Sequence, residues 1–377
     1  MMIRSSGALQ DLLGGFLVYR SLVPVDDRLP TIGDLRPTLG LGADRLPRKA
    51  EFDYARVVGE IAREARVLSG ISKGTTRLLF VGDTMRNDVS AFSNLCAAMG
   101  WTGHAFIADE AGAAAHEVRQ LGDGQQLTIS SRWCDIEKFV NDGWAAGFGC
   151  DEETVVVVDI DKTLVGARGR NDHVIDKARQ RAAYEVVQHL DDGAWTDETS
   201  FKRIYDRIND PIFHPLTEDN QDAVAYSSLL VACGWMSLDE LAARVGQGWI
   251  CGFKGLMDEV AKTWSSLPSG IIRLHEAVRE QVEAGNPTPF VAFRHAEYRC
   301  TAERMGHLPD GTSRETMLDE EIVITEEVWQ AIGTWQARGC LLFGLSDKPD
   351  EACFPPADCP DALPIHGIRT HIVGGRR

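Results

Sequence analysis

Three short apolar runs that end abruptly in polar residues stand out along this chain. Residues 155–158 are four consecutive valines, and residues 78–81 and 340–345 are similar runs with no polar residue at alternate positions. Uninterrupted apolar runs of this length are typical of strands buried on both faces, so we expect all three to belong to one parallel sheet. The valine run predicts the central strand.

Between these runs, apolar residues recur at helical spacing. The stretch 54–68 carries them three and four residues apart and is followed by Gly70, a common helix end. Further helices are predicted to begin at Asp88 and to cover 328–336, whereas 25–49 is rich in Pro, Gly and Asp and predicts a loop. Strands that alternate with helices predict an α/β fold.

Residues 167–325 differ from the rest of the chain because their strongest patterns are helical. We therefore expect a mainly helical insertion between two parts of a core domain. The first part of the core is predicted to span 1–166 and the second part 326–377.

Polar residues follow the central strand at fixed spacing. Asp159, Asp161 and Thr163 form the pattern D-x-D-x-T directly after the valines. Open α/β sheets bind their ligands at the carboxyl ends of the strands, so two carboxylates at this place indicate a reactive site. The simpler interpretation, in which the aspartates only cap a turn, accounts for one carboxylate but not for both.

The D-x-D-x-T pattern resembles the first motif of the haloacid dehalogenase superfamily of aspartate-nucleophile phosphohydrolases. The resemblance implies that Asp159 attacks phosphorus to form an acyl-phosphate, and that Asp161 protonates the leaving oxygen and then activates water. It also implies a substrate-binding role for Thr163. A carboxylate that approaches a phosphate needs its charge offset, so Mg²⁺ is the expected cofactor.

A second unit, in which a strand is followed by G-D-x4-D and a helix, resembles the fourth motif of the same superfamily. That motif completes the metal site through its pair of aspartates, which implies that Asp83 or Asp88 binds Mg²⁺ together with Asp159 and the backbone carbonyl of Asp161. Asn87 occupies the alternative spacing for the second metal ligand. The competing interpretation is that the first aspartate forms an Asx turn and the second caps the helix.

The order of these units departs from the order that is usual in the superfamily, because the fourth-motif unit comes before the first motif. The resemblance therefore implies a circularly permuted Rossmann-like parallel sheet, in which the strands that end at Asp83 and Ser346 lie on opposite sides of the strand that ends at Asp159. Ser346 resembles the second-motif hydroxyl that binds a phosphate oxygen. Two lysines could serve as the third-motif lysine. Lys49, which precedes the helix leading to the fourth-motif strand, is favoured over Lys348.

The helical insertion resembles the cap domains of the superfamily, since it starts directly after the first motif. We expect it to cover the crevice and to restrict the site to a small phosphorylated metabolite. Arg168 and Arg170 at its start are candidate substrate contacts, or else solvated loop residues. The segment FRHAEYR, which contains Arg294 and Glu297, is predicted to form an exposed salt-bridged face in preference to a substrate contact.

Composition narrows the range of partners and compartments. The formal net charge of −17 over 377 residues argues against nucleic acid or an anionic membrane as a partner. Nine cysteines without a C-x-x-C pair predict reduced thiols and a cytoplasmic protein.

Together these patterns predict a Mg²⁺-dependent phosphatase that acts on a small phosphorylated metabolite through an aspartyl-phosphate. Asp161 favours phosphate-ester cleavage over dehalogenation, because a departing halide needs no proton. One alternative is a phosphotransferase or phosphomutase of the same superfamily. The other is a non-catalytic phosphate-binding or scaffold protein, which would not need both a nucleophile and an acid.

Overall fold

The computed structural model describes residues 5–42, 45–145, 147–190, 196–218, 220–263 and 267–375. The chain divides into two compact units. The sheet unit comprises Met1–Ile175, Ala302–Phe354 and Asp361–Arg377, and the helical unit comprises Asp176–Thr301 and Pro355–Pro360. Across the described ranges, no helix is both long enough and apolar enough to cross a lipid bilayer.

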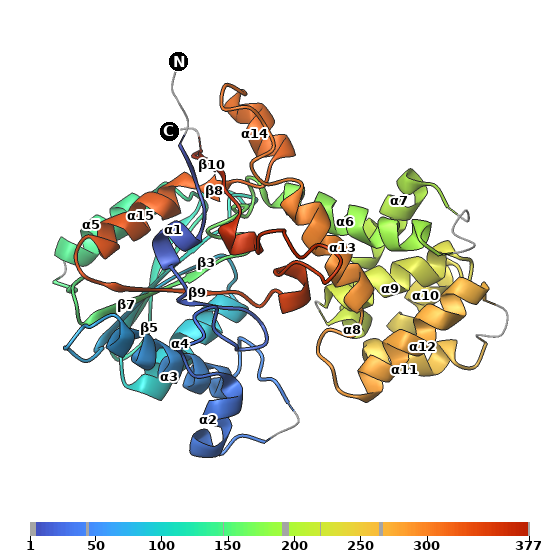
Figure 1. Cartoon of the computed structure of the whole chain (residues 1–377), viewed down its shortest axis with the longest axis horizontal. Helices are drawn as coiled ribbons and strands as arrows, with labels where there is room; N and C mark the ends of the chain where they lie inside the picture. The colour runs from blue at the N-terminus through green and yellow to red at the C-terminus, as the bar shows by residue number, and fades with distance from the viewer. Residues whose placement is uncertain are drawn as a thin grey trace. The chain divides into compact units, whose positions relative to one another are not determined.

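A seven-stranded sheet organises the sheet unit (Figure 1). Its order is β2-β9-β7-β3-β4-β6-β5, and neighbouring strands are parallel except for the antiparallel pair β6 and β5. In that order the strands span Leu17–Val18, Leu341–Leu345, Thr154–Asp159, Arg77–Gly82, Thr102–Ala108, Gln125–Ser130 and His116–Gly122. The predicted α/β fold with a mostly parallel sheet is confirmed.

Strand β7 contains the four valines and lies between β3 and β9. All six of its residues are buried, which explains why the sequence shows no alternation of polar and apolar residues here. Asp83 directly follows β3 and Ser346 directly follows β9. The predicted arrangement of these two strands on opposite sides of the strand that ends at Asp159 is therefore confirmed.

Helices cover both faces of this sheet, as Figure 1 shows. Helices α3 (Phe52–Leu68) and α4 (Asn87–Met99) lie on one face, and α5 (Asp135–Ala145) and α15 (Glu326–Gln336) lie on the other. The first face buries one continuous apolar core, which includes Val58, Ile61, Phe80, Phe92, Val157 and Phe343. Burial of such a core is the main stabilising contribution to the unit.

A second, three-stranded sheet has the order β1-β10-β8. Strand β1 (Ser6–Gly7) pairs antiparallel with β10 (Thr370–Val373), which in turn pairs parallel with β8 (Ile324–Thr325). This sheet draws segments from both ends of the chain together.

The boundary of the helical unit differs from the expected insertion, because residues 302–325 belong to the sheet unit. Helix α14 (Arg314–Glu320) lies in this stretch, and its Met317 packs against Val373 of the small sheet. Asn171, near the start of the expected insertion, also belongs to the sheet unit. Its side-chain amide donates to the backbone carbonyls of Leu318 (2.7 Å) and Glu321 (2.9 Å). These contacts tie both ends of the expected insertion to the sheet unit.

Two segments of the sheet unit do not follow the predictions. Helix α2 (Ile32–Leu39) lies in the predicted loop, where Thr31 and Asp34 form a capping box that starts a helix despite the Pro and Gly content. Strand β5 is exposed along its whole length, so no apolar pattern marked it. The remaining short elements are α1 (Gln10–Leu13), η3 (Asp350–Ala352) and η4 (Ile365–Gly367).

The helical unit is built from helices along its described part, as predicted. Helix α6 (Asp172–Gln188) begins in the sheet unit and continues into the helical unit. The elements that follow are α7 (Glu198–Ile208), η1 (Pro211–Phe213), α8 (His214–Thr217), α9 (Gln221–Ala232), α10 (Leu238–Gly246), α11 (Gly252–Val260), α12 (Ser269–Glu283) and α13 (Val291–Ala302).

Candidate active site

Three buried carboxylates meet at the carboxyl edge of the main sheet. Asp159 ends β7, Asp83 follows the neighbouring strand β3, and Asp88 comes from the first turn of α4. One oxygen of each can be chosen so that all three atoms lie within 4.8 Å of one another. Among the described residues, this is the cluster of acidic side chains whose geometry could hold a metal ion.

Asp88 reaches this edge because the turn after β3 wraps around its carboxylate. Its Oδ2 accepts hydrogen bonds from the backbone N–H groups of Asp83 (3.0 Å) and Thr84 (2.8 Å) and from the Thr84 hydroxyl (2.7 Å). Gly82 is required for this approach, since a Cβ at that position would lie 2.6 Å from the carboxyl carbon of Asp88. The G-D-x4-D spacing therefore folds the second aspartate back onto the strand end.

Lys49 joins the cluster from the segment that precedes α3. Its buried ammonium forms ion pairs with Asp88 Oδ1 (2.6 Å) and with Asp159 Oδ1. Of the two candidate lysines, the structure thus brings Lys49 to the aspartates. Lys348 is also buried, and its backbone N–H donates to the hydroxyl of Ser346 (3.1 Å).

Ser346 lies beside the cluster because strands β7 and β9 are in register. Asp159 is paired with Leu345, and the N–H of Ile160 donates to the carbonyl of Leu345 (3.0 Å). The side chain of Ser346 is buried and follows directly. This arrangement brings the predicted phosphate-binding hydroxyl to the same sheet edge as Asp159.

The negative charges of this cluster outnumber its cations. Arg168 Nε donates to Asp83 Oδ2, so Lys49 and Arg168 offset two of the charges that the three carboxylates carry when ionised. Oδ2 of Asp159 is buried and has no hydrogen-bond partner among the described residues. A buried carboxylate oxygen without a donor is costly, so this site suits an additional cation.

Burial and crowding shift the acidities of these groups. Burial and the charges of Asp88 and Asp161 together raise the pKa of Asp159 to about 7, against the opposing effect of the Lys49 ammonium. Burial and the two neighbouring carboxylates raise the pKa of Asp83 well above its ordinary value, although Arg168 opposes them. Burial lowers the pKa of Lys49, but Asp159 and Asp88 outweigh this effect and raise it overall.

The D-x-D-x-T segment folds into a tight loop after β7. Val165 N–H donates to the carbonyl of Ile160 (2.9 Å), Lys162 N–H donates to the carbonyl of Val165 (2.8 Å), and Lys162 adopts a positive φ of 68°. Asp161 is half-buried in this loop, and its charge contributes to the raised pKa of Asp159. The hydroxyl of Thr163 is buried and makes no hydrogen bond with a described residue.

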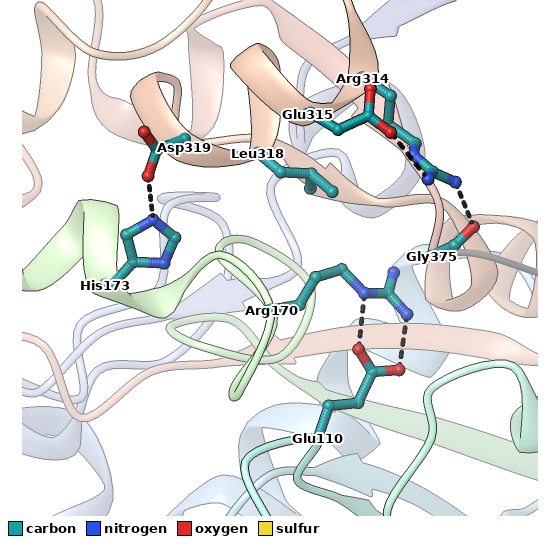
Figure 2. Close-up of a pocket in the computed structure, with 8 residues that line it drawn as sticks. All are labelled: Glu110, Arg170, His173, Arg314, Glu315, Leu318, Asp319 and Gly375. Atoms are coloured by element: carbon teal, nitrogen blue, oxygen red, sulfur yellow. Dashed lines mark hydrogen bonds and ion pairs between the residues drawn. The ribbon is translucent and has the colours of Figure 1, made fainter.

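The side chain of Arg170, a predicted site residue, is paired outside the cluster. Arg170 is paired with Glu110 (2.8 Å) and Glu327 (2.8 Å), and no described contact links it to the three aspartates. Figure 2 shows this arginine beside Glu110 in a separate pocket of about 350 Å³. Asn87 is half-buried at the start of α4 and makes no side-chain hydrogen bond with the described part of the chain.

Two residues at the site were absent from the sequence prediction. The hydroxyl of Thr84 donates to Asp88. A threonine directly after Asp83 could have been recognised in the sequence, because hydroxyl side chains often form hydrogen bonds within turns. Tyr54 was assigned only to the apolar face of α3. Its side chain is fully buried, yet its hydroxyl has no hydrogen-bond partner among the described residues and is within electrostatic reach of Lys49.

The sheet order and the site define an α/β protein with a buried cluster of carboxylates and a lysine at the carboxyl edge of its central strands. Comparisons with protein-family models, with curated proteins and with solved structures find no match for this chain. Its function therefore has to be argued from the geometry of the site.

Proposed function

We propose that this chain is a Mg²⁺-dependent phosphatase that acts on small phosphorylated metabolites through an aspartyl-phosphate at Asp159. The observation that carries the proposal is the free Oδ2 of Asp159, buried at the sheet edge while Oδ1 is held by Lys49. A carboxylate that is oriented through one oxygen and has no hydrogen-bond partner at the other is suited to nucleophilic attack. The resemblance to the haloacid dehalogenase superfamily, with permuted strand order, supports the same proposal.

Each chemical step can be assigned to residues of this chain. Asp159 Oδ2 forms a bond to phosphorus, and the bond between phosphorus and the leaving oxygen breaks while Asp161 donates a proton to that oxygen. Asp161 then takes a proton from water, whose oxygen attacks phosphorus. The bond to Asp159 breaks, inorganic phosphate leaves, and both carboxyl groups return to their starting states. Ser346 would donate its hydroxyl to a phosphate oxygen.

The carboxylates differ in their suitability as metal ligands. Both oxygens of Asp88 are engaged, one by Lys49 and the other by the turn that contains Thr84. Asp159 is held by Lys49 through Oδ1, and Asp83 is held by Arg168 through Oδ2. Asp83, and Asp159 through the oxygen that does not attack phosphorus, are therefore the side chains that would hold Mg²⁺, with Asp88 positioning Lys49. The bound ion would offset the negative charge of the carboxylates and the phosphate.

The substrate class and the compartment are part of the proposal. The helical unit begins in the sequence soon after the motif loop, as the cap domains of the haloacid dehalogenase superfamily do, and this resemblance supports a small substrate. The nine cysteines are present as thiols, which supports a reducing compartment such as the cytoplasm.

The test is release of inorganic phosphate from p-nitrophenyl phosphate and from ethyl phosphate, with Mg²⁺ or with EDTA. We expect Mg²⁺-dependent release from both esters. Asp161→Asn should lower kcat/KM for ethyl phosphate by about 10²–10⁴-fold, the range typical of acid catalysis, and much less for p-nitrophenyl phosphate, whose leaving group needs no proton.

Other outcomes would separate the alternatives. Release that persists in EDTA would contradict the metal requirement, and equal losses on both esters would remove Asp161 from the acid role. Transfer of the phosphoryl group to an added alcohol in preference to water would identify a phosphotransferase. Phosphate binding without any turnover would identify a non-catalytic protein.

A further inference from the structure

A pocket of about 460 Å³ adjoins the carboxylate cluster within the sheet unit. Asp83 and Arg168 line both the pocket and the cluster. The pocket continues over the ends of β4 and β6, the next strands along from β3. Its volume is in the range of sites for small organic molecules. A phosphate ester bound at Asp159 could therefore extend its alcohol portion past Asp83 into this pocket.

Two apolar side chains of the sheet line the pocket. Ile107 of β4 and Ile129 of β6 both line it and stand directly opposite each other in the strand register. Ala113 and Ala115 line it from the loop that connects β4 to β5. Two branched side chains from paired strands and two small residues of this loop give the pocket an apolar part with a fixed base.

The hydroxyl groups in the pocket wall are already engaged by the protein. Ser130 donates to Asp135 (2.6 Å), and Thr84 donates to Asp88 (2.7 Å). Ser131 accepts from the backbone N–H of Ala115 (2.8 Å). A polyhydroxylated ligand would compete with these bonds, whereas an apolar group would contact the surface that they leave available.

Further hydrogen bonds fix the loop that forms one wall of the pocket. The backbones of Ser131 and Ala115 are linked by a further bond of 2.9 Å, and Asp109 N–H donates to the carbonyl of Ser130 (3.1 Å). The side chain of Asp109 also accepts from the N–H of Ala111 (2.8 Å). The loop that carries the two alanines is thus tied to the end of β6 and needs little ordering when a ligand binds.

We propose that this pocket receives the alcohol portion of the substrate and selects phosphomonoesters that carry an apolar, ring-sized group close to the phosphate. This inference rests on the proposed phosphatase function and adds the chemical class of its substrate. Polyhydroxylated esters of similar size are the class that the pocket disfavours.

The test compares kcat/KM for 2-phenylethyl phosphate, ethyl phosphate and glycerol 3-phosphate in the full chain with Mg²⁺. All three are primary alkyl esters that need a protonated leaving group, so their comparison reports mainly on binding. We expect 2-phenylethyl phosphate to exceed both others by about tenfold or more, as removal of a phenyl group from water predicts.

Ala115→Trp should fill the pocket, and Ala114→Trp is the matched control, because Ala114 is exposed in the same loop and does not line the pocket. Ala115→Trp should abolish the preference and leave kcat/KM for ethyl phosphate within about twofold, since that ester ends before the pocket. Ala114→Trp should retain the preference.

The outcomes distinguish this inference from the proposed function. Turnover of all three esters without a preference, or a preference for glycerol 3-phosphate, would overturn the inference and leave the phosphatase intact. An equal loss on every ester in Ala115→Trp, with normal turnover in Ala114→Trp, would also overturn it. Absence of turnover with any ester would overturn the proposed function and the inference together.

Discussion

Each of the two units of this chain buries a group of carboxylates, and the two groups are balanced differently. In the helical unit, Asp222 and Glu297 are buried with Arg294 between them, and Arg179 adds a second guanidinium. In the sheet unit, three aspartates share Lys49 and one arginine. The first group is neutral when ionised, whereas the second retains a negative charge.

The hydrogen bonds of the two groups differ in the same way. Both oxygens of Asp222 are engaged, by Phe290 N–H (3.1 Å) and by Arg294 (2.6 Å), and both oxygens of Glu297 are engaged by Arg179 (3.0 Å) and Arg294 (2.6 Å). Asp159 keeps an open oxygen in the sheet unit. A buried network in which every carboxylate oxygen has a partner stabilises the folded structure. A network at a sheet edge that leaves one oxygen without a partner is suited to binding a ligand.

The largest expected effect follows from this contrast. Asp159→Asn should lower turnover by on the order of 10⁴-fold or more, because the amide cannot attack phosphorus. Thermal unfolding should still occur at or above the wild-type temperature, since the substitution removes a buried charge. The matched control is Asp151→Asn, three residues before the same strand begins, which should retain full activity. Equal activity in both variants would contradict the catalytic role of Asp159.

The converse variant in the helical unit should affect stability. Asp222→Ala leaves Arg294 buried without one of its two carboxylate partners, and we expect a loss of about 3–5 kcal/mol in the free energy of unfolding in urea. Asp258→Ala, which removes an exposed ion pair with Lys254, should cost less than about 0.5 kcal/mol. If the two variants unfold alike, the buried network does not have the structural role assigned to it.

A smaller effect should accompany metal binding. At 100 times its dissociation constant, Mg²⁺ should stabilise the wild-type chain by about 2.7 kcal/mol, because it binds only the folded state. Asp83→Asn should reduce this gain, whereas Asp222→Asn should retain it, since the helical network has no open oxygen. A Mg²⁺-induced rise in the unfolding temperature that survives Asp83→Asn would contradict the assigned ligands.

The sequence predicted the structure best for short segments whose residues are all buried. The valines of β7, and the apolar runs before Asp83 and Ser346, identified the central strands and their common edge, because a strand buried on both faces needs apolar residues throughout. The G-D-x4-D spacing then placed Asp88 near Asp159. Lys49 was favoured on its position before α3, and the ion pairs place it against both aspartates.

Ion-pair partners that lie far apart in the sequence could not be predicted. The ion pairs expected in FRHAEYR are present, but Arg294 and Glu297 are buried and not exposed, because Asp222 supplies a second partner from a distant helix. Arg170 was considered only as a substrate contact or a solvated residue. Its actual partners, Glu110 and Glu327, lie far from it in the sequence and could not be paired with it by spacing alone.

The most direct test of the central claim is to trap the covalent intermediate on Asp159. The full chain is mixed with 2-phenylethyl phosphate and Mg²⁺, quenched in acid and treated with borohydride, which reduces an acyl-phosphate to the alcohol. Peptide mass spectrometry should then find homoserine at position 159 and unmodified aspartate at positions 83, 88 and 161. Turnover without reduction at position 159, or reduction at another aspartate, would contradict the account.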